Sequence, residues 1–331
     1  MSGVALGERF DGIICDLDGV VYAGAVAVEH AVDALNRVGL PTVYATNNAS
    51  RTPAEVADHL RGLGVHVEDE GVLTSSVAAA RRLAEDLPAG TTVLAVGGPG
   101  VAAALRDSGL HARTPGDPGE VAAVLQGYGP HVTAADLGEA AHAIRAGARW
   151  VATNDDLTLP TERGPAPGNG ALVAAVRHAV DRDPEVIGKP HPAMYEMAAD
   201  ALGLPPARVL AIGDRLETDI AGAHAAGTAG ALVLTGVHGP VELASAPFAQ
   251  RPQYVLADLR GLAEDYPEAF VRDGWHLRGP ARARVSPDGQ LEVAGTGTDV
   301  LRAALDALWA ARDAGAITAQ DAGRLVPERV A

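Results

Sequence analysis

Short apolar runs alternate with Ala-rich amphipathic stretches along most of the chain. The first run, residues 12–15, predicts a buried strand, and the spacing of apolar positions over 28–38 predicts the helix that follows it. A second series of strands and helices begins near Val77, and the first rhythm returns after Gly188. Such alternation is typical of parallel sheets covered by helices. The other predicted elements are strands over 42–45, 93–96, 121–126, 150–153, 209–212 and 231–234, and helices over 53–63, 77–87, 101–108, 134–146, 193–202 and 218–226.

The two series predict one core domain that is interrupted by an inserted domain. A different pattern begins near residue 265, with a hairpin-like segment over 281–293 and an amphipathic helix over 299–314. We therefore expect a small α+β module at the end of the chain. The predicted organisation is a first part of the core over 1–76, an inserted α/β domain over 77–184, a second part of the core over 185–262, and a C-terminal module over 265–331.

Composition and charge narrow the classes of function. The 331 residues are 47% hydrophobic, enough to bury more than one core. The net charge is −16 and no Lys/Arg-rich stripe with interleaved aromatics is present, which argues against nucleic acid and anionic membranes as partners. An anionic small substrate stays compatible, because a metal and a few cations can meet its charge locally. The single cysteine, Cys15, excludes an internal disulfide and a multi-cysteine zinc site; the first residues carry no signal-peptide pattern, so we expect a cytoplasmic protein.

The strongest chemical signal is a pair of carboxylates directly after the first predicted strand. Asp16 and Asp18 lie two residues apart where the chain leaves this strand. Parallel α/β sheets bind ligands at the carboxyl ends of their strands, so both acids can approach one small site. One would serve as nucleophile and the other as general acid and base. Taken alone, an Asp-x-Asp-Gly segment is more often a solvated turn.

Three further segments add polar groups that suit phosphate chemistry. Thr46-Asn47-Asn48 offers a hydroxyl and backbone N–H groups at the start of a helix, where phosphate oxygens bind. Lys189 places a cation in a short Gly-Lys-Pro turn. Asp214 and Asp219 add two acids after a later strand, and hard oxygen ligands in this number suit Mg²⁺. The simpler interpretations are a capped helix, a surface lysine and an acid at a helix N-terminus.

Together, and in this order, the four segments resemble the four motifs of the haloacid dehalogenase (HAD) superfamily of phosphohydrolases. Only 30 residues separate Asp16 from Thr46, which leaves no room for a large cap domain there, whereas 143 residues separate Thr46 from Lys189. The inserted domain therefore resembles the C2-type cap of class IIA. The resemblance implies an α/β fold: a Rossmann-like, doubly wound parallel core with an inserted α/β cap.

The resemblance also implies a role for each matching residue in a Mg²⁺-dependent phosphatase. Asp16 is implied as the nucleophile that forms an aspartyl-phosphate, and Asp18 as the general acid and base. Lys189 is implied as the cation that neutralises the phosphoryl group and the attacking carboxylate. The implied metal ligands are Asp16, Asp18 through its backbone carbonyl, Asp214, and Asp219 directly or through water; the implied phosphate-binding residues are Thr46, Asn47 and Asn48.

Polar residues of the predicted cap are candidates for substrate recognition. Asn154, Asp156 and Glu162 could donate or accept hydrogen bonds with substrate hydroxyls, and Arg163 could meet an anion. Loop capping and turn formation explain each of them at least equally well.

The Thr-Asn-x-Asp and Pro-Gly-x-Gly segments of the cap closely resemble those of glycerol 3-phosphate phosphatases of high-GC bacteria, which also carry a C-terminal module. This resemblance implies hydrolysis of glycerol 3-phosphate to glycerol and phosphate, in the recycling of glycerophospholipid head groups. Within class IIA, the substrate could instead be a nucleotide monophosphate, pyridoxal phosphate, phosphoglycolate or p-nitrophenyl phosphate.

Interpretations from other classes carry less support. A strand followed by Gly97-Gly98-Pro99-Gly100 suggests an NAD(P)-dependent oxidoreductase, but the segment fails the G-x-G-x-x-G spacing. A phosphotransferase or mutase usually carries the other cap type, and the Asp16 to Thr46 spacing counts against it. The C-terminal module resembles at most a truncated acetyltransferase that is too short for that chemistry. We therefore expect it to have a structural or interaction role. The cap or this module could join copies of the chain in a homo-oligomer.

Overall fold

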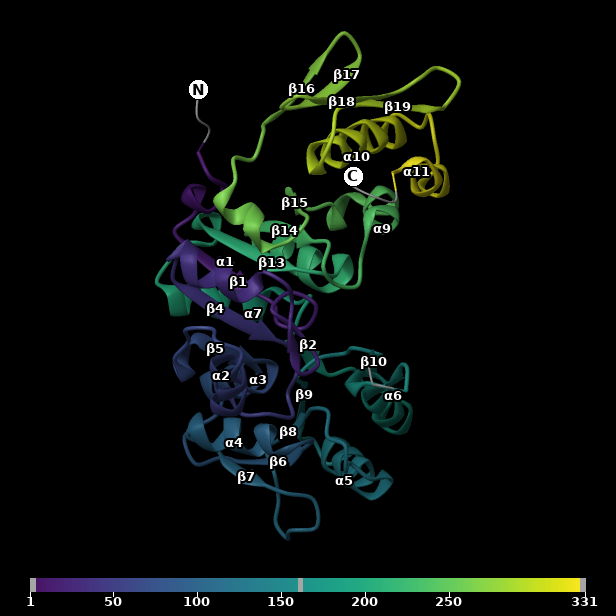
Figure 1. The fold of residues 1–331 in the computed structure, drawn as a ribbon. Helices are drawn as coiled ribbons and strands as arrows, with labels where there is room; N and C mark the ends of the chain where they lie inside the picture. Colours follow the sequence, from purple (N-terminus) through teal and green to yellow (C-terminus); the bar gives the residue numbers. More distant parts are fainter. Residues whose placement is uncertain (1–3, 160–162, 328–331) are drawn as a thin grey trace. The chain divides into compact units, whose positions relative to one another are not determined.

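The computed structural model describes residues 4–159 and 163–327, which form two compact units. Unit 1 comprises the described residues up to Thr42 and from Leu204 onward, and unit 2 comprises Val43–Gly203. Both units contain parallel strands flanked by helices (Figure 1). The predicted α/β fold class is therefore confirmed.

Unit 1 contains a parallel sheet in the order β15-β14-β13-β1, formed by β1 (Gly12–Cys15), β13 (Val209–Gly213), β14 (Ala229–Val233) and β15 (Tyr254–Leu256). Every residue of β1 is buried, as is usual for a parallel strand. Cys15, the last residue of β1, pairs with Ile212 of β13. The two strands therefore release the chain side by side, at Asp16 and at Asp214.

One π-helical turn interrupts the regular helices of unit 1. The sequence predicts a single helix over 218–226, whereas the structure has a π turn over Leu216–Ile220 followed by α8 (Ala221–Ala225). The Ile220 N–H donates to the Arg215 carbonyl, five residues back, at 3.2 Å. Hydrophobic spacing does not separate a π turn from an α turn, and such turns are frequent at functional sites. The other helices of this part are α1 (Ala31–Val38) and α9 (Pro240–Ser245).

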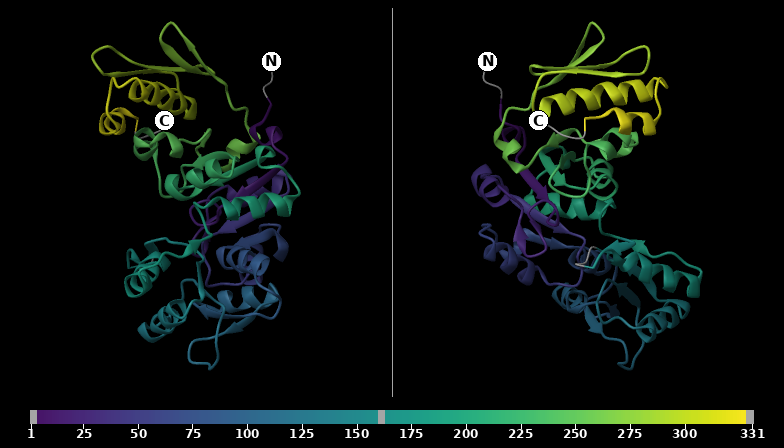
Figure 2. Two further views of the ribbon diagram at one scale, coloured as in Figure 1. Left: turned by 180° about the vertical axis from the view of Figure 1, so that it is seen from behind. Right: turned by 45° about the vertical axis from the view of Figure 1, so that its right-hand side comes forward.

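The C-terminal part of unit 1 is an antiparallel sheet covered by a helix. The sheet consists of β16 (Ala269–Arg272), β17 (Trp275–Arg278), β18 (Ala281–Val285) and β19 (Leu291–Ala294), and the helices are α10 (Thr298–Asp313) and α11 (Ala319–Leu325). Figure 2 shows α10 along one face of the sheet. Small residues on both sides of this contact, among them Ala283 and Ala304, let the helix approach the strands closely. The β18–β19 hairpin and α10 were predictable from their patterns, but β16 is exposed throughout and shows no alternation.

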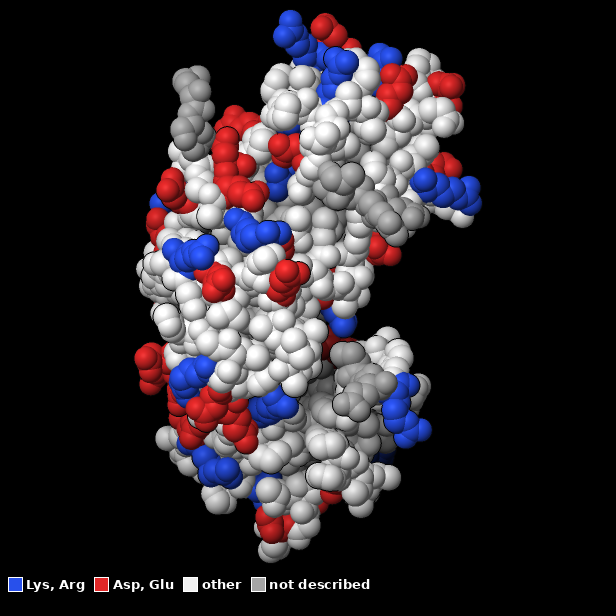
Figure 3. Space-filling view, in the orientation of Figure 1, with Lys and Arg blue, Asp and Glu red and all other residues white. Residues whose placement is uncertain are grey.

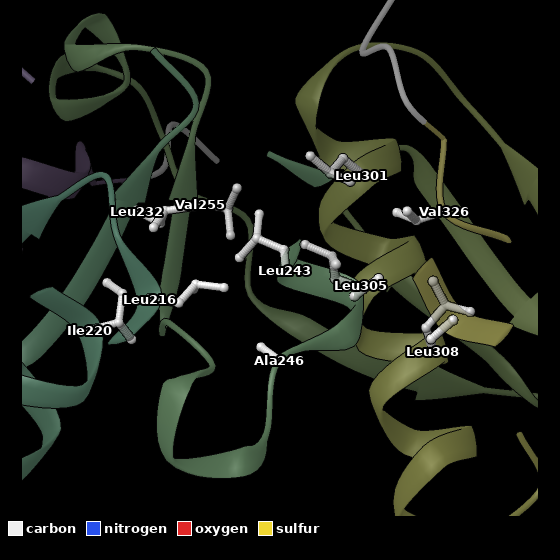
Figure 4. Close-up of a cluster of buried hydrophobic side chains, with 12 residues drawn as sticks. Leu216, Ile220, Leu232, Leu243, Ala246, Val255, Leu301, Leu305, Leu308 and Val326 are labelled. Atoms are coloured by element: carbon white, nitrogen blue, oxygen red, sulfur yellow. The ribbon is translucent and has the colours of Figure 1, made fainter. Parts of the chain in front are cut away.

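A hydrophobic cluster joins α10 to the parallel part of unit 1. Figure 4 shows Leu243 of α9 between Val255 of β15 and Leu305 of α10. The Trp309 indole N–H donates to the Leu243 carbonyl at 2.9 Å, and Arg302 donates to the Val255 carbonyl at 2.9 Å. The amphipathic helix predicted over 299–314 therefore packs on the core of its own unit.

Unit 2 contains two groups of parallel strands. β4 (Thr42–Thr46) pairs with β5 (Val72–Thr74), and a five-stranded sheet has the order β12-β9-β8-β6-β7. The strands of this sheet are β6 (Thr92–Val96), β7 (His111–Arg113), β8 (Ala123–Gln126), β9 (Arg149–Ala152) and β12 (Glu185–Val186). The helices of unit 2 are α2 (Pro53–Gly62), α3 (Ser75–Asp86), α4 (Pro99–Asp107), α5 (Ala134–Arg145), α6 (Asn169–Val180) and α7 (Pro192–Leu202).

Helix α6 is the longest element that the sequence does not predict. It begins inside the Pro-Gly-x-Gly segment, whose composition favours a turn. The buried side chain of Asn169 explains the start of the helix, because its amide donates to the Asn154 carbonyl at 2.7 Å. A buried polar contact of this kind leaves no periodic signal.

Charged side chains of both signs are interspersed over the face shown in Figure 3. Within the described ranges, no helix combines the length and the apolar composition that crossing a bilayer requires.

Candidate active site

Three acidic side chains of unit 1 converge where two neighbouring parallel strands end. Asp16 follows β1, Asp214 follows β13, and Asp219 lies in the π turn. One carboxylate oxygen of each lies within 4.8 Å of the other two. Asp214 and Asp219 are buried and Asp16 is half-buried. Carboxylates this close repel one another unless a cation neutralises them, so the cluster has the character of a metal site.

Glycines make room for the two buried acids. A Cβ on Gly236 would lie 2.0 Å from Oδ2 of Asp214, and a Cβ on Gly213 would lie 2.2 Å from the Cβ of Asp219. The backbone also fixes the carboxylates: the Val237 N–H donates to Asp214 Oδ2 at 2.8 Å, and the Arg215 N–H donates to Asp219 Oδ2 at 3.1 Å. The orientation of both acids is therefore set before any ligand binds.

Asp18 lies in a tight turn two residues beyond Asp16, and it is exposed. The turn depends on Gly19, whose φ of +82° is unfavourable for other residues. The Gly19 N–H donates to the Tyr22 carbonyl at 2.8 Å, and the Thr235 hydroxyl donates to the Gly19 carbonyl at 2.8 Å. Two loops of unit 1 thus hold the Asp-x-Asp-Gly segment in place.

The other predicted residues of the core belong to unit 2. Thr46 is buried at the end of β4, and its hydroxyl oxygen accepts the Asn48 N–H at 3.1 Å. Lys189 is only 4% exposed. Its backbone N–H donates to Asn47 Oδ1 at 2.8 Å, and its carbonyl accepts from Asn47 Nδ2 at 3.0 Å. The fold of unit 2 therefore brings together Asn47 and Lys189, which are 142 residues apart in the sequence.

Two predicted substrate residues of the cap contact Asn47 as well. Asn154 is buried, and its amide donates to the Asn47 carbonyl at 2.7 Å. Asp156 Oδ2 accepts from Asn47 Nδ2 at 3.0 Å. These contacts favour the structural interpretation of both residues, in which they hold a loop.

The remaining predicted site residues are Asn48, Arg163 and Glu162. Asn48 Oδ1 accepts from the Ser50 N–H at 2.9 Å, shortly before Thr52 caps α2. Arg163 is exposed. Glu162 lies outside the described residues.

A histidine and a carboxylate link the same cap loop to the turn that follows Lys189. His191 Nε2 lies 3.9 Å from Asp155 Oδ2. The nearby His191 lowers the pKa of Asp155, and this outweighs the opposing effect of burial. The loop after β9 therefore meets the Lys189 turn at two points: Asp155 lies near His191, and the Thr153 carbonyl accepts the Gly188 N–H at 2.8 Å.

Several supporting residues could not be recognised in the sequence. Gly236 and Val237 shape the acid cluster from the loop after β14, and the Ser75 hydroxyl donates to the Asn47 carbonyl at 2.7 Å. A Thr-Gly pair directly after a strand of the core was the available signal for the first loop. Ser75 gave none, because its role depends on a contact with a residue 28 positions away.

The acid cluster fits a Mg²⁺ ion. Mg²⁺ prefers oxygen ligands at about 2.1 Å in octahedral geometry, so two ligand oxygens on opposite sides of the ion lie about 4.2 Å apart. Three carboxylate oxygens within 4.8 Å of one another are compatible with that arrangement.

Comparison with known proteins assigns the chain to a family. A model of haloacid dehalogenase-like hydrolases matches residues 13–111, and a HAD-hydrolase-like model matches residues 186–262. The D-glycerol 3-phosphate phosphatase of Mycobacterium tuberculosis is 42% identical over 317 residues, which cover 94% of this chain and 89% of the relative. The chain belongs to the haloacid dehalogenase-like hydrolases. It is a phosphatase of this family, as predicted from its motifs.

Solved and curated members of the haloacid dehalogenase-like family support the fold. A crystal structure of glycerol phosphate phosphatase from M. tuberculosis in complex with magnesium has a TM-score of 0.84 at 40% identity, and the match covers 93% of each chain. The predicted HAD fold is thereby confirmed, and Mg²⁺ is confirmed as a metal of this family. An acid sugar phosphatase from Staphylococcus haemolyticus is 36% identical, with 76% of this chain and 95% of the relative covered.

Proposed function

We propose that this phosphatase hydrolyses glycerol 3-phosphate to glycerol and phosphate with Mg²⁺ as its cofactor. The observation that carries the proposal is the 42% identity, over 94% of the chain, to a D-glycerol 3-phosphate phosphatase. The cluster of Asp16, Asp214 and Asp219 agrees with a divalent cation. We also propose the domain limits expected from the sequence, and a role in the recycling of glycerophospholipid head groups.

The proposed metal ligands are the carboxylates of Asp16, Asp214 and Asp219 and the backbone carbonyl of Asp18. Whether Asp219 binds directly or through water, its burial and its hydrogen bond from Arg215 keep it oriented toward the cluster. Bound Mg²⁺ would supply positive charge that offsets the repulsion between an attacking carboxylate and an anionic phosphate.

The proposed chemistry has two displacement steps at phosphorus. A carboxylate oxygen of Asp16 attacks the phosphorus, the ester P–O bond breaks, and Asp18 donates its proton to the leaving alkoxide of glycerol. Asp18 then takes a proton from water, the water oxygen bonds to phosphorus, and the Asp16–phosphorus bond breaks. The exposed position of Asp18, in a turn fixed by Gly19, suits a group that must reach both the leaving group and water.

We assign the phosphoryl oxygens to Thr46, Asn47, Asn48 and Lys189, on the motif pattern of the family. The side-chain N–H groups of Asn47 already donate to Lys189 and Asp156, so its phosphate contact would come from its backbone N–H. We assign the glycerol end to the cap, with Arg163 as the best candidate for direct contact. Asn154 and Asp156 would act there mainly by shaping the loop.

A sugar phosphate is the second candidate substrate. The 36% identity to an acid sugar phosphatase, over 76% of this chain, favours it over nucleotide monophosphates, pyridoxal phosphate and phosphoglycolate. The homo-oligomer through the cap or the C-terminal module and the cytoplasmic location stay predictions from the sequence.

Phosphate release with and without Mg²⁺ tests the proposal across glycerol 3-phosphate, a hexose phosphate, UMP, pyridoxal phosphate and phosphoglycolate. We expect the highest kcat/KM for glycerol 3-phosphate and no turnover after chelation. A higher kcat/KM for another ester would make that ester the substrate in place of glycerol 3-phosphate. Turnover without metal would show that the acid cluster does not act as a metal site in the reaction.

A further inference from the structure

Lys189 is the only lysine of the chain. The sequence contains 26 Lys and Arg residues, and 25 of them are Arg. Every other Lys or Arg position of the chain is an arginine, so Lys189 carries its one side-chain ammonium group. Lys189 is buried, at 4% exposure. An ammonium is a compact point charge on a flexible stem, so its catalytic value depends on how its backbone is held.

The side chain of Asn47 holds the backbone of Lys189 at two points. Its Oδ1 accepts the Lys189 N–H at 2.8 Å, and its Nδ2 donates to the Lys189 carbonyl at 3.0 Å. These two groups belong to the two peptide units that flank the Cα of Lys189, so the Asn47 amide holds the backbone on both sides of that Cα. Gly188 is required for this approach, because a Cβ there would lie 2.6 Å from Asn47 Oδ1.

Asn47 is itself anchored on several sides. The second N–H of its amide donates to Asp156 at 3.0 Å, so both side-chain donors are used. Its carbonyl accepts from Ser75 and from Asn154, both at 2.7 Å, and both of those side chains are buried. The contact is therefore supported by buried side chains of unit 2.

We infer that Asn47 is a positioning residue for Lys189: its side-chain amide fixes the backbone on both sides of the Lys189 Cα and so aims the single ammonium group at the phosphoryl group. The inference rests on the proposed function for its catalytic consequence. It narrows the role of Asn47, because the side chain acts on Lys189 and only the backbone N–H is left for phosphate.

The single lysine makes the contact directly measurable. Protein labelled with ¹⁵N-lysine gives one backbone amide signal, that of Lys189, and its hydrogen exchange reports the bond to Asn47 Oδ1. We expect exchange in Asn47→Ala to be at least about tenfold faster than in wild type, because the amide loses its acceptor. Asn48→Ala is the matched control, since the Asn48 amide bonds Ser50 instead, and its Lys189 exchange should equal that of wild type. Unchanged exchange in Asn47→Ala would overturn the inference whether or not the protein is a phosphatase.

A double-mutant cycle tests the catalytic part. Asn47→Ala should lower kcat on the order of 10²-fold with a smaller change in KM, the size expected when a catalytic group is misplaced by about 1 Å. In a Lys189→Ala background the same change should lower kcat by less than about threefold, because the group that it positions is gone. An equal loss in both backgrounds would show that Asn47 acts independently of Lys189 and would overturn the inference.

A second variant covers the case in which Asn47→Ala fails to fold. Asn47→Asp keeps an acceptor for the Lys189 N–H but loses the donor to the Lys189 carbonyl and to Asp156. We expect slow exchange of the Lys189 amide with a reduced kcat. Wild-type kcat in this variant would contradict the two-point contact.

Discussion

The acid cluster of unit 1 and the amide cluster of unit 2 are both polar sites inside a fold, but they differ in charge. In unit 1, three carboxylates lie within 4.8 Å of one another, and glycines let them approach. In unit 2, Asn47, Asn154 and Lys189 satisfy one another through neutral hydrogen bonds of 2.7 to 3.0 Å.

This difference in charge determines which cluster depends on a ligand. Close carboxylates raise the free energy of the folded state until a cation neutralises them, whereas paired amides are stable without one. We therefore expect unit 1 to respond to metal and unit 2 to respond to the loss of single hydrogen bonds.

Asp16→Asn should abolish most of the catalytic activity while leaving the fold intact. The amide is nearly the same size as the carboxylate but cannot attack phosphorus, so we expect kcat to fall by at least about 10⁴-fold. Steady-state phosphate release and circular dichroism check the two halves of this prediction. A variant with activity near that of wild type would exclude Asp16 as nucleophile.

Gly236→Ala should disturb the same cluster without removing any acid. The new Cβ would lie 2.0 Å from Asp214 Oδ2, so the carboxylate must move. We expect kcat/KM to fall on the order of 10²-fold and the Mg²⁺ concentration for half-maximal activity to rise. Gly62→Ala is the control: no atom lies within 4 Å of its added Cβ, and activity should be unchanged. Equal Mg²⁺ dependence in the Gly236→Ala and wild-type proteins would mean that Asp214 is not a ligand.

Mg²⁺ should stabilise the fold through the acid cluster and not through the amide cluster. At 100 times its dissociation constant, Mg²⁺ should raise the free energy of unfolding by about 2.7 kcal/mol. Asp214→Asn should abolish this gain. Asn154→Ala should instead cost about 0.5 to 1.5 kcal/mol through the lost hydrogen bond to the Asn47 carbonyl, which still accepts from Ser75, and keep the gain from Mg²⁺. Denaturant titrations with and without Mg²⁺ make the comparison, and a gain retained by Asp214→Asn would place the metal elsewhere.

Low pH should produce the smallest change in stability, through Asp155 and His191 beside the amide cluster. His191 lowers the pKa of Asp155 in the folded state, so this carboxylate stabilises the fold above its ordinary pKa of about 3.9 and the contribution is lost as the pH falls through the folded value. Both side chains are partly exposed, His191 at 41% and Asp155 at 48%, so we expect less than about 1 kcal/mol, and its loss should begin only as the pH falls below about 4. Unfolding of wild type and Asp155→Asn between pH 3 and pH 6 measures it. The same pH dependence in both proteins would exclude the pair as its source.

The sequence revealed the parts of the site that lie at the ends of apolar strands. Asp16 and Asp214 follow two such strands, and the sheet register brings them together as a parallel α/β fold requires. The metal prediction followed from the number and type of these oxygens.

Parts that depend on contacts between distant segments could not be predicted. The pairing of Asn47 with Lys189 joins residues 142 positions apart, and the space beside Asp214 comes from Gly236 in another loop. The π turn that carries Asp219 was missed because one extra residue in a turn does not alter hydrophobic spacing enough to be seen.

Trapping the phosphoenzyme is the most direct test of whether Asp16 attacks phosphorus. Wild-type protein is mixed with Mg²⁺ and glycerol 3-phosphate radiolabelled in its phosphate, quenched in acid within the first turnover, and digested. We predict label on the peptide that contains Asp16, and none with Asp16→Asn. Release of labelled phosphate without a labelled peptide at any quench time, or label on another peptide, would contradict the account.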